Sequence, residues 1–156
     1  MQTLQHWSET SAFFIWLRES PSIWAYPAVF FAHTIGLIFS VGASVVVSAR
    51  TIAAARAPLV APLAKFFPAI WIGVALTVLS GGVMLGADPE TKLSNPLFPA
   101  KMLLAAAAVV LMIVLRRQLA ATELSASVRP STRVVAAALL VCWLGIVAAG
   151  KFMAYF

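Results

Sequence analysis

The chain has 156 residues, of which 62% are hydrophobic and 10% charged, and its formal net charge is +6. Soluble domains are about 45–50% apolar and about 25% charged, so this composition excludes a water-soluble globular domain. The basic residues lie at the ends of apolar runs, which is typical of membrane topology, and we therefore expect no nucleic-acid partner. The single cysteine excludes an intramolecular disulfide and any Cys-x-x-Cys motif.

The first element that we predict is an amphipathic helix at about residues 3–19. Leu4, Trp7, Ser11 and Phe14 recur there at helical spacing, and Pro21 follows shortly after. The segment is too short to cross a bilayer, and it lacks the basic start and the long apolar run of a signal peptide. We interpret it as an interfacial helix on the outer membrane surface.

Four longer apolar segments follow, at about residues 23–49, 67–85, 98–115 and 134–156. A helix needs about 20 residues to cross about 30 Å of hydrocarbon. Three of the segments carry an aromatic–Pro–Ala sequence at or near their start, where proline is tolerated because its missing N–H has no partner there. The predicted fold class is all-α: one integral membrane domain over residues 1–156, a four-helix transmembrane bundle with an N-terminal interfacial amphipathic helix.

The charges predict the orientation of these spans. Two connections, 50–65 and 116–133, carry most of the basic residues against a single acid, Glu123. Their cations are Arg50, Arg56, Lys65, Arg116, Arg117, Arg129 and Arg133. The positive-inside rule places both connections in the cytoplasm. We therefore expect a multi-pass protein of the bacterial inner membrane, with both termini on the periplasmic side.

His33 is the main candidate for a functional residue. It lies about ten residues into the first segment, which at 1.5 Å per residue is about 15 Å deep, near the middle of the hydrocarbon. An ionisable side chain in a span marks a functional site by default; the alternative is a neutral imidazole bonded to a facing hydroxyl or carbonyl. Gly36, one turn later, either admits a neighbouring helix or leaves space for a flat cofactor. Thr77 and Gly81 suggest the same choice in the second span.

Other candidates lie near the outer ends of the later spans. Lys101 and Lys151 either snorkel to the lipid headgroups or offer cations to an anionic ligand. Met84 and Met102 carry thioethers that can ligate haem iron or copper(I), but methionine is also ordinary apolar filler. No paired intramembrane carboxylates and no Gly-rich phosphate loop occur in the sequence, which argues against hydrolysis and phosphoryl transfer.

Three stretches resemble the motifs of an uncharacterised bacterial family of small four-helix membrane proteins. They are His33-Thr34-Ile35-Gly36, Pro68-Ala69-Ile70-Trp71-Ile72-Gly73 and Asn95-Pro96-Leu97-Phe98-Pro99-Ala100-Lys101. They match the family's His-x-x-Gly, Pro-x-x-Trp-x-Gly and Asn-Pro-x-Phe-x-x-Lys, and the likeness covers most of residues 7–115. The family's glutamate three residues before the histidine is Phe30 here, so no proton-relay role transfers from the resemblance. The histidine and lysine helices are also similar, more distantly, to copper-resistance membrane protein D and to HemJ-type protoporphyrinogen oxidases, which implies a haem or copper site.

Together these features favour a b-type haem protein that transfers electrons at the outer side of the membrane. His33 would be the axial metal ligand, Gly36 would make room for the macrocycle, and Lys101 and Lys151 would neutralise the propionates. The candidates for the sixth ligand are His6, Met84, Met102, Met153 and His33 of a second subunit. We expect an electron carrier rather than an enzyme; as an enzyme it would be an oxidoreductase or a subunit of one.

Three alternatives stay open beside the haem hypothesis. The chain is a cofactor-free small transporter or channel-like protein, an accessory subunit of a larger membrane complex, or the holder of a copper(I) site. The partners that we expect are membrane lipids, further copies of the chain or other subunits of a membrane complex, and quinone as the electron acceptor or donor.

Overall fold

The structure is a computed structural model that describes residues 6, 9–54, 60–122 and 127–153. These residues contain no β-strand. The helices, in chain order, are α2 (Ala12–Glu19), α3 (Tyr26–Leu37), η1 (Ile38–Gly42), α4 (Ala43–Ala53), η3 (Ala61–Phe66), α5 (Phe67–Ala87), α6 (Pro89–Ser94), α7 (Leu97–Thr122) and α8 (Pro130–Phe152). Of these, η1 is a π-helix and η3 is a 3-10 helix.

Four helices are long and apolar enough to cross a membrane. They are Tyr26–Ala53, which joins α3, η1 and α4, then Pro62–Ala87, Leu97–Thr122 and Pro130–Phe152. The chain is therefore a multi-pass membrane protein, and the predicted all-α four-helix bundle is confirmed. The helix boundaries differ from the predicted spans most clearly in α7, which continues beyond residue 115 to Thr122. Arginine is a good helix former, so Arg116 and Arg117 mark the edge of the apolar region without ending the helix.

Proline marks the start of three of these helices. Pro27, Pro68 and Pro130 each lie in the first turn of their helix, α3, α5 and α8 respectively. The fixed φ of proline suits a helix, and the N–H that it lacks has no intrahelical acceptor in the first turn. The aromatic–Pro–Ala pattern therefore locates the first residue of α3 and α5, Tyr26 and Phe67.

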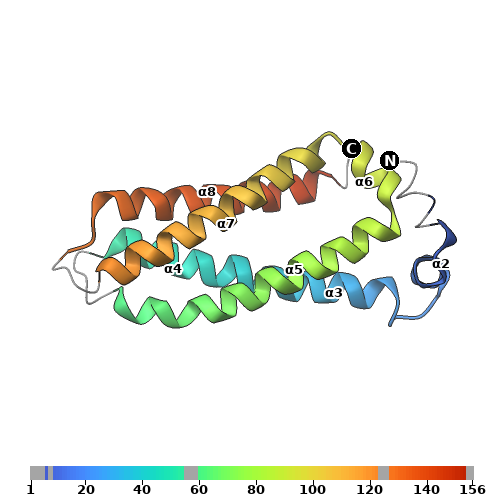
Figure 1. Cartoon of the computed structure of the whole chain (residues 1–156), viewed down its shortest axis with the longest axis horizontal. Helices are drawn as coiled ribbons and strands as arrows, with labels where there is room; N and C mark the ends of the chain where they lie inside the picture. The colour runs from blue at the N-terminus through green and yellow to red at the C-terminus, as the bar shows by residue number, and fades with distance from the viewer. Residues whose placement is uncertain (1–5, 7–8, 55–59, 123–126, 154–156) are drawn as a thin grey trace.

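The spans form two antiparallel pairs, α3 with α5 and α7 with α8, and α4 joins the pairs by packing on α8 (Figure 1). One end of the bundle carries α2 and α6, and we call it the α2 end. The other end carries the connections between α4 and η3 and between α7 and α8, and we call it the basic end. Figure 1 shows the ribbons of α3 and α8 well separated toward the α2 end.

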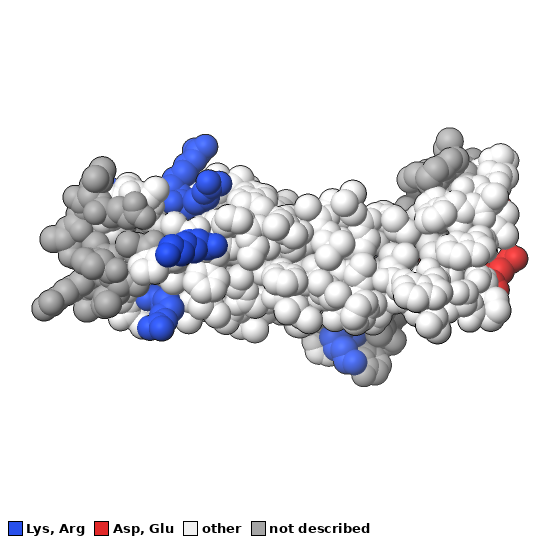
Figure 2. All heavy atoms as spheres, turned by 90° about the horizontal axis from the view of Figure 1, so that it is seen from below, with Lys and Arg blue, Asp and Glu red and all other residues white. Residues whose placement is uncertain are grey.

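Charge is distributed unevenly between these two ends. On the face in Figure 2, most of the Lys and Arg gather toward one end and acidic side chains lie at the other. Arg50 lies in the last turn of α4, and Arg129 directly precedes α8, so both belong to the basic end. Asp88 and Glu90 lie at the start of α6, at the α2 end. The long surface between the ends is apolar, as a lipid-facing surface must be.

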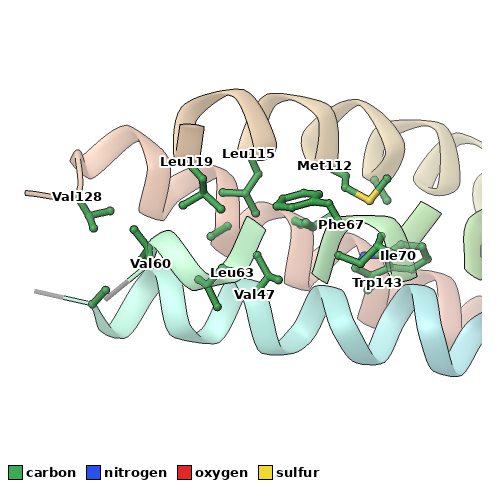
Figure 3. Packing of buried hydrophobic residues seen from close by; sticks show 14 of the residues in the cluster. Val47, Val60, Leu63, Phe67, Ile70, Met112, Leu115, Leu119, Val128 and Trp143 are labelled. Carbon is green, nitrogen blue, oxygen red and sulfur yellow. The ribbon is translucent and has the colours of Figure 1, made fainter. Parts of the chain in front are cut away.

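The main buried cluster lies in the half of the bundle toward the basic end. It joins all four spans through residues such as Val47, Ile70, Met112, Leu115 and Trp143 (Figure 3). Lipid is as apolar as these side chains, so close van der Waals packing, rather than removal from water, holds the helices together here. No residue of α3 belongs to this cluster. The half toward the α2 end has a smaller cluster of its own, formed by Phe14, Leu17, Ala25 and Ala87.

The helices α3 and α5 cross at two glycines. A Cβ atom on Gly73 would lie 2.5 Å from the amide nitrogen of Ser40 and 2.7 Å from the carbonyl oxygen of Gly36. A Cβ atom on Gly36 would lie 2.5 Å from the hydroxyl oxygen of Thr77. The two backbones therefore touch directly, and only glycine at both positions allows this approach.

The π-helix η1 directly follows this crossing and changes the direction that the first span faces. Before it, α3 packs on α5; after it, α4 packs mainly on α8. A π-turn inserts one extra residue, which rotates the following helix relative to the preceding one. The buried hydroxyl of Ser40, inside η1, donates to the carbonyl of Gly36 at 2.8 Å. One long helix thereby contacts both pairs, with a different face in each half.

The predicted interfacial helix is observed as α2, while residues 3–5, 7 and 8 of the prediction lie outside the described residues. Phe14 and Leu17 are buried against the α2 end of the α3–α5 pair, and the ring of Phe14 lies on Gly86. Phe13 and Trp16, on the other side of α2, are 50% and 46% exposed. Exposed aromatic rings beside a span are typical of the membrane–water boundary.

Candidate functional site

The candidate site lies between α3 and α5 on the α2 side of the Gly36–Gly73 crossing, one turn from Gly36 along α3 and two turns from Gly73 along α5. His33 of α3 is half-buried, and its Nδ1 lies 3.0 Å from the hydroxyl oxygen of Ser80 on α5. Ser80 itself is buried. The imidazole also interacts with the backbone of Thr77, one turn earlier on α5. The glycine crossing fixes the register of the two helices, and that register places the histidine opposite the serine.

The hydroxyl of Ser80 determines which nitrogen of His33 carries the proton. A serine hydroxyl has one hydrogen, and Ser80 donates it to the carbonyl of Leu76 at 2.5 Å. With the hydrogen in that bond, the Ser80 oxygen accepts from the imidazole, so Nδ1 carries the hydrogen and Nε2 keeps its lone pair; a hydroxyl that donated to Nδ1 instead would reverse the tautomer. The hydrogen bond with Ser80 is made at Nδ1. The geometry therefore presents a fixed imidazole with an unprotonated nitrogen, which is the form that binds a metal or accepts a proton.

The depth predicted for His33 needs correction. The helix begins at Tyr26, not at residue 23, so His33 lies seven residues from its start, about 10 Å along the axis. The span runs from Tyr26 to Ala53, and its middle falls in η1, near Phe39. The histidine therefore lies in the half of the span toward the α2 end rather than at the centre.

Of the two alternatives for Gly36, the structure shows the close approach of helices. Thr77 and Gly73 fill the space where a side chain on Gly36 would lie, so Gly36 lines no space for a macrocycle in this structure. Gly81 is the glycine that faces the imidazole: a Cβ atom there would lie 3.3 Å from Cε1 of His33. Gly82 is exposed, and nothing lies within 4 Å of its missing Cβ.

Lys101, in the first turns of α7, is brought to the same region from the other helix pair. Its side chain is half-buried, and its Nζ would lie 3.6 Å from a Cβ atom on Gly150 of α8. A Cβ atom at Gly150 would therefore be in ordinary van der Waals contact with the end of the lysine side chain, which lies against α8. Lys101 lies close enough to His33 for the two side chains to interact electrostatically. A half-buried ammonium in a span is expensive, which favours an anionic partner for it.

The other candidates lie further from this arrangement or on the surface. Met84 is half-buried and lies one turn beyond Ser80 on α5, whereas Met102 is 45% exposed. Lys151 and His6 are exposed. Met153 is half-buried at the end of α8, where its backbone carbonyl accepts a hydrogen bond from the side-chain Nδ2 of Asn95 at 3.4 Å. The structure therefore brings Lys101 toward His33, places Met84 one turn beyond Ser80 on α5, and leaves Met102, Lys151 and His6 on the surface.

Ser80 is the residue of this site that the sequence analysis did not identify. A serine in an apolar helix usually bonds to its own backbone, and Ser80 also does this, so its sequence context gives no signal of a second role. The signal lies in the pairing of the two helices. Once Gly36 is placed against Gly73 and Thr77 in an antiparallel pair, Ser80, seven residues beyond Gly73, faces His33.

Comparisons with known proteins add no family assignment. No protein-family model, no curated protein and no solved structure matches the chain.

Proposed function

We propose that this chain is a membrane protein that binds b-type haem between its two helix pairs and carries electrons. The observation that supports the proposal is the His33–Ser80 bond. Imidazoles that ligate a metal donate their other ring N–H to a protein acceptor, which fixes the ring and raises its basicity. Ser80 would play this part for Nδ1, and Nε2 of His33 would then hold the iron. Bound haem would supply one-electron redox chemistry.

The basic residues fit the anionic edge of such a group. Lys101 is half-buried between the pairs and is positioned to neutralise a propionate, and Lys151 at the end of α8 offers a second cation at the membrane surface. The pairing also explains why a lysine is kept in an apolar setting, where an unpaired charge is costly. The chain's residues would hold the group, fix its orientation and keep it in an apolar environment.

A second residue would complete the coordination of the iron. Met84 is the methionine of this chain that lies on the same helix face as Ser80 and is half-buried. A thioether together with an imidazole would hold haem iron and would raise its reduction potential. We therefore propose Met84, or His33 of a second copy of the chain, ahead of the exposed Met102 and His6.

We also propose an orientation and a location. The basic end would lie in the cytoplasm and the α2 end in the periplasm of the bacterial inner membrane, as the positive-inside rule requires. The haem would then lie in the outer half of the membrane, where quinone or a partner protein can exchange electrons with it. Further copies of the chain, or subunits of a larger complex, would cover part of the apolar surface.

A copper(I) site is the second candidate. Soft thioether and imidazole ligands select copper(I), and His33 with Met84 offers one of each. Among the described residues no group of three or more His, Cys, Asp or Glu comes together, so methionines would have to complete the ligand set. Lys101 favours haem over copper, because a cation beside a metal ion is repelled whereas a propionate attracts it.

Titration of the purified protein with haemin tests the proposal. We expect a saturable Soret band in the wild type, its loss in His33→Ala, and affinity about tenfold lower in Lys101→Ala, the effect of losing about 1.4 kcal/mol. Thr34→Val is the matched control, because Thr34 is exposed and adjacent to His33. Equal titrations of His33→Ala and the wild type would exclude His33 as the ligand, and copper(I) titration of the same variants tests the second candidate.

A further inference from the structure

The first span carries a row of buried hydroxyl groups on the side of the crossing away from His33. All members of the row have no exposed surface, although they lie in an apolar helix. They are spaced by four, four and three residues, which puts them on one helix face: Ser40, Ser44, Ser48 and Thr51. Beyond η1 this face packs on α8.

The two ends of the row bond to their own helix, but its middle does not. Ser40 donates to the carbonyl of Gly36 at 2.8 Å, and Thr51 donates to the carbonyl of Val47 at 2.7 Å. The hydroxyls of Ser44 and Ser48 are buried and have no hydrogen-bond partner among the described residues. Buried polar groups in native proteins are nearly always bonded to protein or to ordered water. In this structure the two serine hydroxyls make no bond to their own helix, which leaves them available to a partner at the interface.

The opposing helix α8 has unpartnered polar groups of its own. Thr132 Oγ1 and Trp143 Nε1 are buried and have no partner among the described residues. The guanidinium of Arg133 donates to the carbonyl of Ala54 at 2.8 Å, which sets the register between α8 and α4. Trp143 is ten residues from Arg133, and Ser44 is ten residues from Ala54, so the two are about level. Both lie about 15 Å from the basic end, half of a hydrocarbon core of about 30 Å.

We propose that the α4–α8 interface binds a row of water molecules that brings protons from the basic end to the middle of the membrane. Water suits the site because it donates and accepts, as the serine and threonine hydroxyls do, and accepts from the indole N–H, which only donates. Ser44 and Ser48 are one helical turn apart, about 6 Å, which is the length of two hydrogen bonds through one water.

Proton movement along the row needs no other reactant. Each oxygen accepts a proton from one neighbour and releases its own to the next, so one proton advances and nothing is oxidised or reduced. The row ends near Ser44 and Trp143, on the basic side of the Gly36–Gly73 crossing. The water row does not depend on haem, so a test of the row is independent of a test of the proposed function.

Exchange of the Trp143 indole N–H with D₂O tests the row directly. Protein labelled with ¹⁵N-tryptophan in lipid nanodiscs gives one indole signal per tryptophan, and Trp143→Phe identifies the signal of interest. We expect Trp143, which is 6% exposed, to exchange readily, and the variant Ser44→Ala with Ser48→Ala to slow this exchange at least tenfold. Thr122→Ala is the control, because Thr122 is a buried hydroxyl of α7 outside the row that bonds to Gln118. It should leave the rate unchanged.

The opposite change in the exchange rate would identify an interface without water. If Trp143 donates directly to Ser44, the indole is protected in the wild type and the serine-to-alanine variant speeds its exchange. Either that result or equal rates in the wild type and the variant would overturn the water row. The remaining indole signals show whether each variant keeps its fold.

Discussion

Replacing Gly73 by alanine should force α3 and α5 apart. The new Cβ atom would lie 2.5 Å from the backbone nitrogen of Ser40, and ordinary contact begins at 3.4 Å, so the helices must separate by about 0.9 Å. Neither contact atom belongs to a flexible side chain that can move aside, because the second close atom is the carbonyl oxygen of Gly36 at 2.7 Å. Overpacking of this kind costs about 1–3 kcal/mol.

The intrinsic effect of alanine must be separated from this crowding. Alanine favours a helix over glycine by about 1 kcal/mol. In Gly73→Ala this higher helix propensity offsets part of the stability that the crowding removes. Gly82→Ala supplies the control, because it lies in the same helix and nothing lies within 4 Å of its Cβ position. The difference between the two variants isolates the crowding, and we expect Gly73→Ala to be the less stable by about 1–3 kcal/mol.

The free energy of unfolding in bilayer-like micelles, measured by denaturant titration or steric trapping, gives this difference. The same separation should lengthen the bond between His33 and Ser80, now 3.0 Å, and weaken any ligand that depends on it. Equal stabilities for Gly73→Ala and Gly82→Ala would refute the direct backbone contact at the crossing.

Three further predictions concern the ends and the surface of the bundle. Phe14→Ala should release α2 and raise backbone hydrogen exchange there while the spans stay folded, because a buried ring worth about 3–5 kcal/mol is removed; Phe13→Ala, at an exposed ring, should have little effect. A cysteine at Ser127 should be labelled from the cytoplasmic side and one at Asp88 from the periplasmic side, and the reverse pattern would invert the proposed orientation. Native mass spectrometry from mild detergent should show oligomers or a stable complex, and monomer alone at every concentration would argue against both.

The sequence predicts the architecture well because its signals are local. Apolar length gives the spans, and the proline of each aromatic–Pro–Ala stretch lies in the first turns of its helix, as Pro27 and Pro68 show. The π-helix after Leu37 gives no such local signal. It appears where the backbone of Ser40 meets Gly73, so it depends on a contact between segments far apart in the sequence.

The site is predicted less completely for the same reason. His33 and Lys101 stand out because ionisable groups are rare in spans, and no pairing information is needed to notice them. The roles of Gly36 and Ser80 depend on which helix faces α3. A glycine one turn from a histidine can make room for a cofactor or for a neighbouring helix. The positions of Thr77 and Gly73 show that the neighbour at Gly36 is a helix. The buried serines Ser44 and Ser48 likewise become informative only once α8 is placed against them.

Chemical rescue of His33→Gly by imidazole is the most direct test of the central claim that His33 is the axial ligand of a haem. The variant removes the whole ring and leaves a space next to Ser80 that free imidazole can enter. We predict that the wild type shows a Soret band with haem, that His33→Gly loses it, and that added imidazole restores it while acetate at the same concentration does not. A wild type that stays colourless with haem, or a His33→Gly protein with an unchanged spectrum before imidazole is added, would contradict the account.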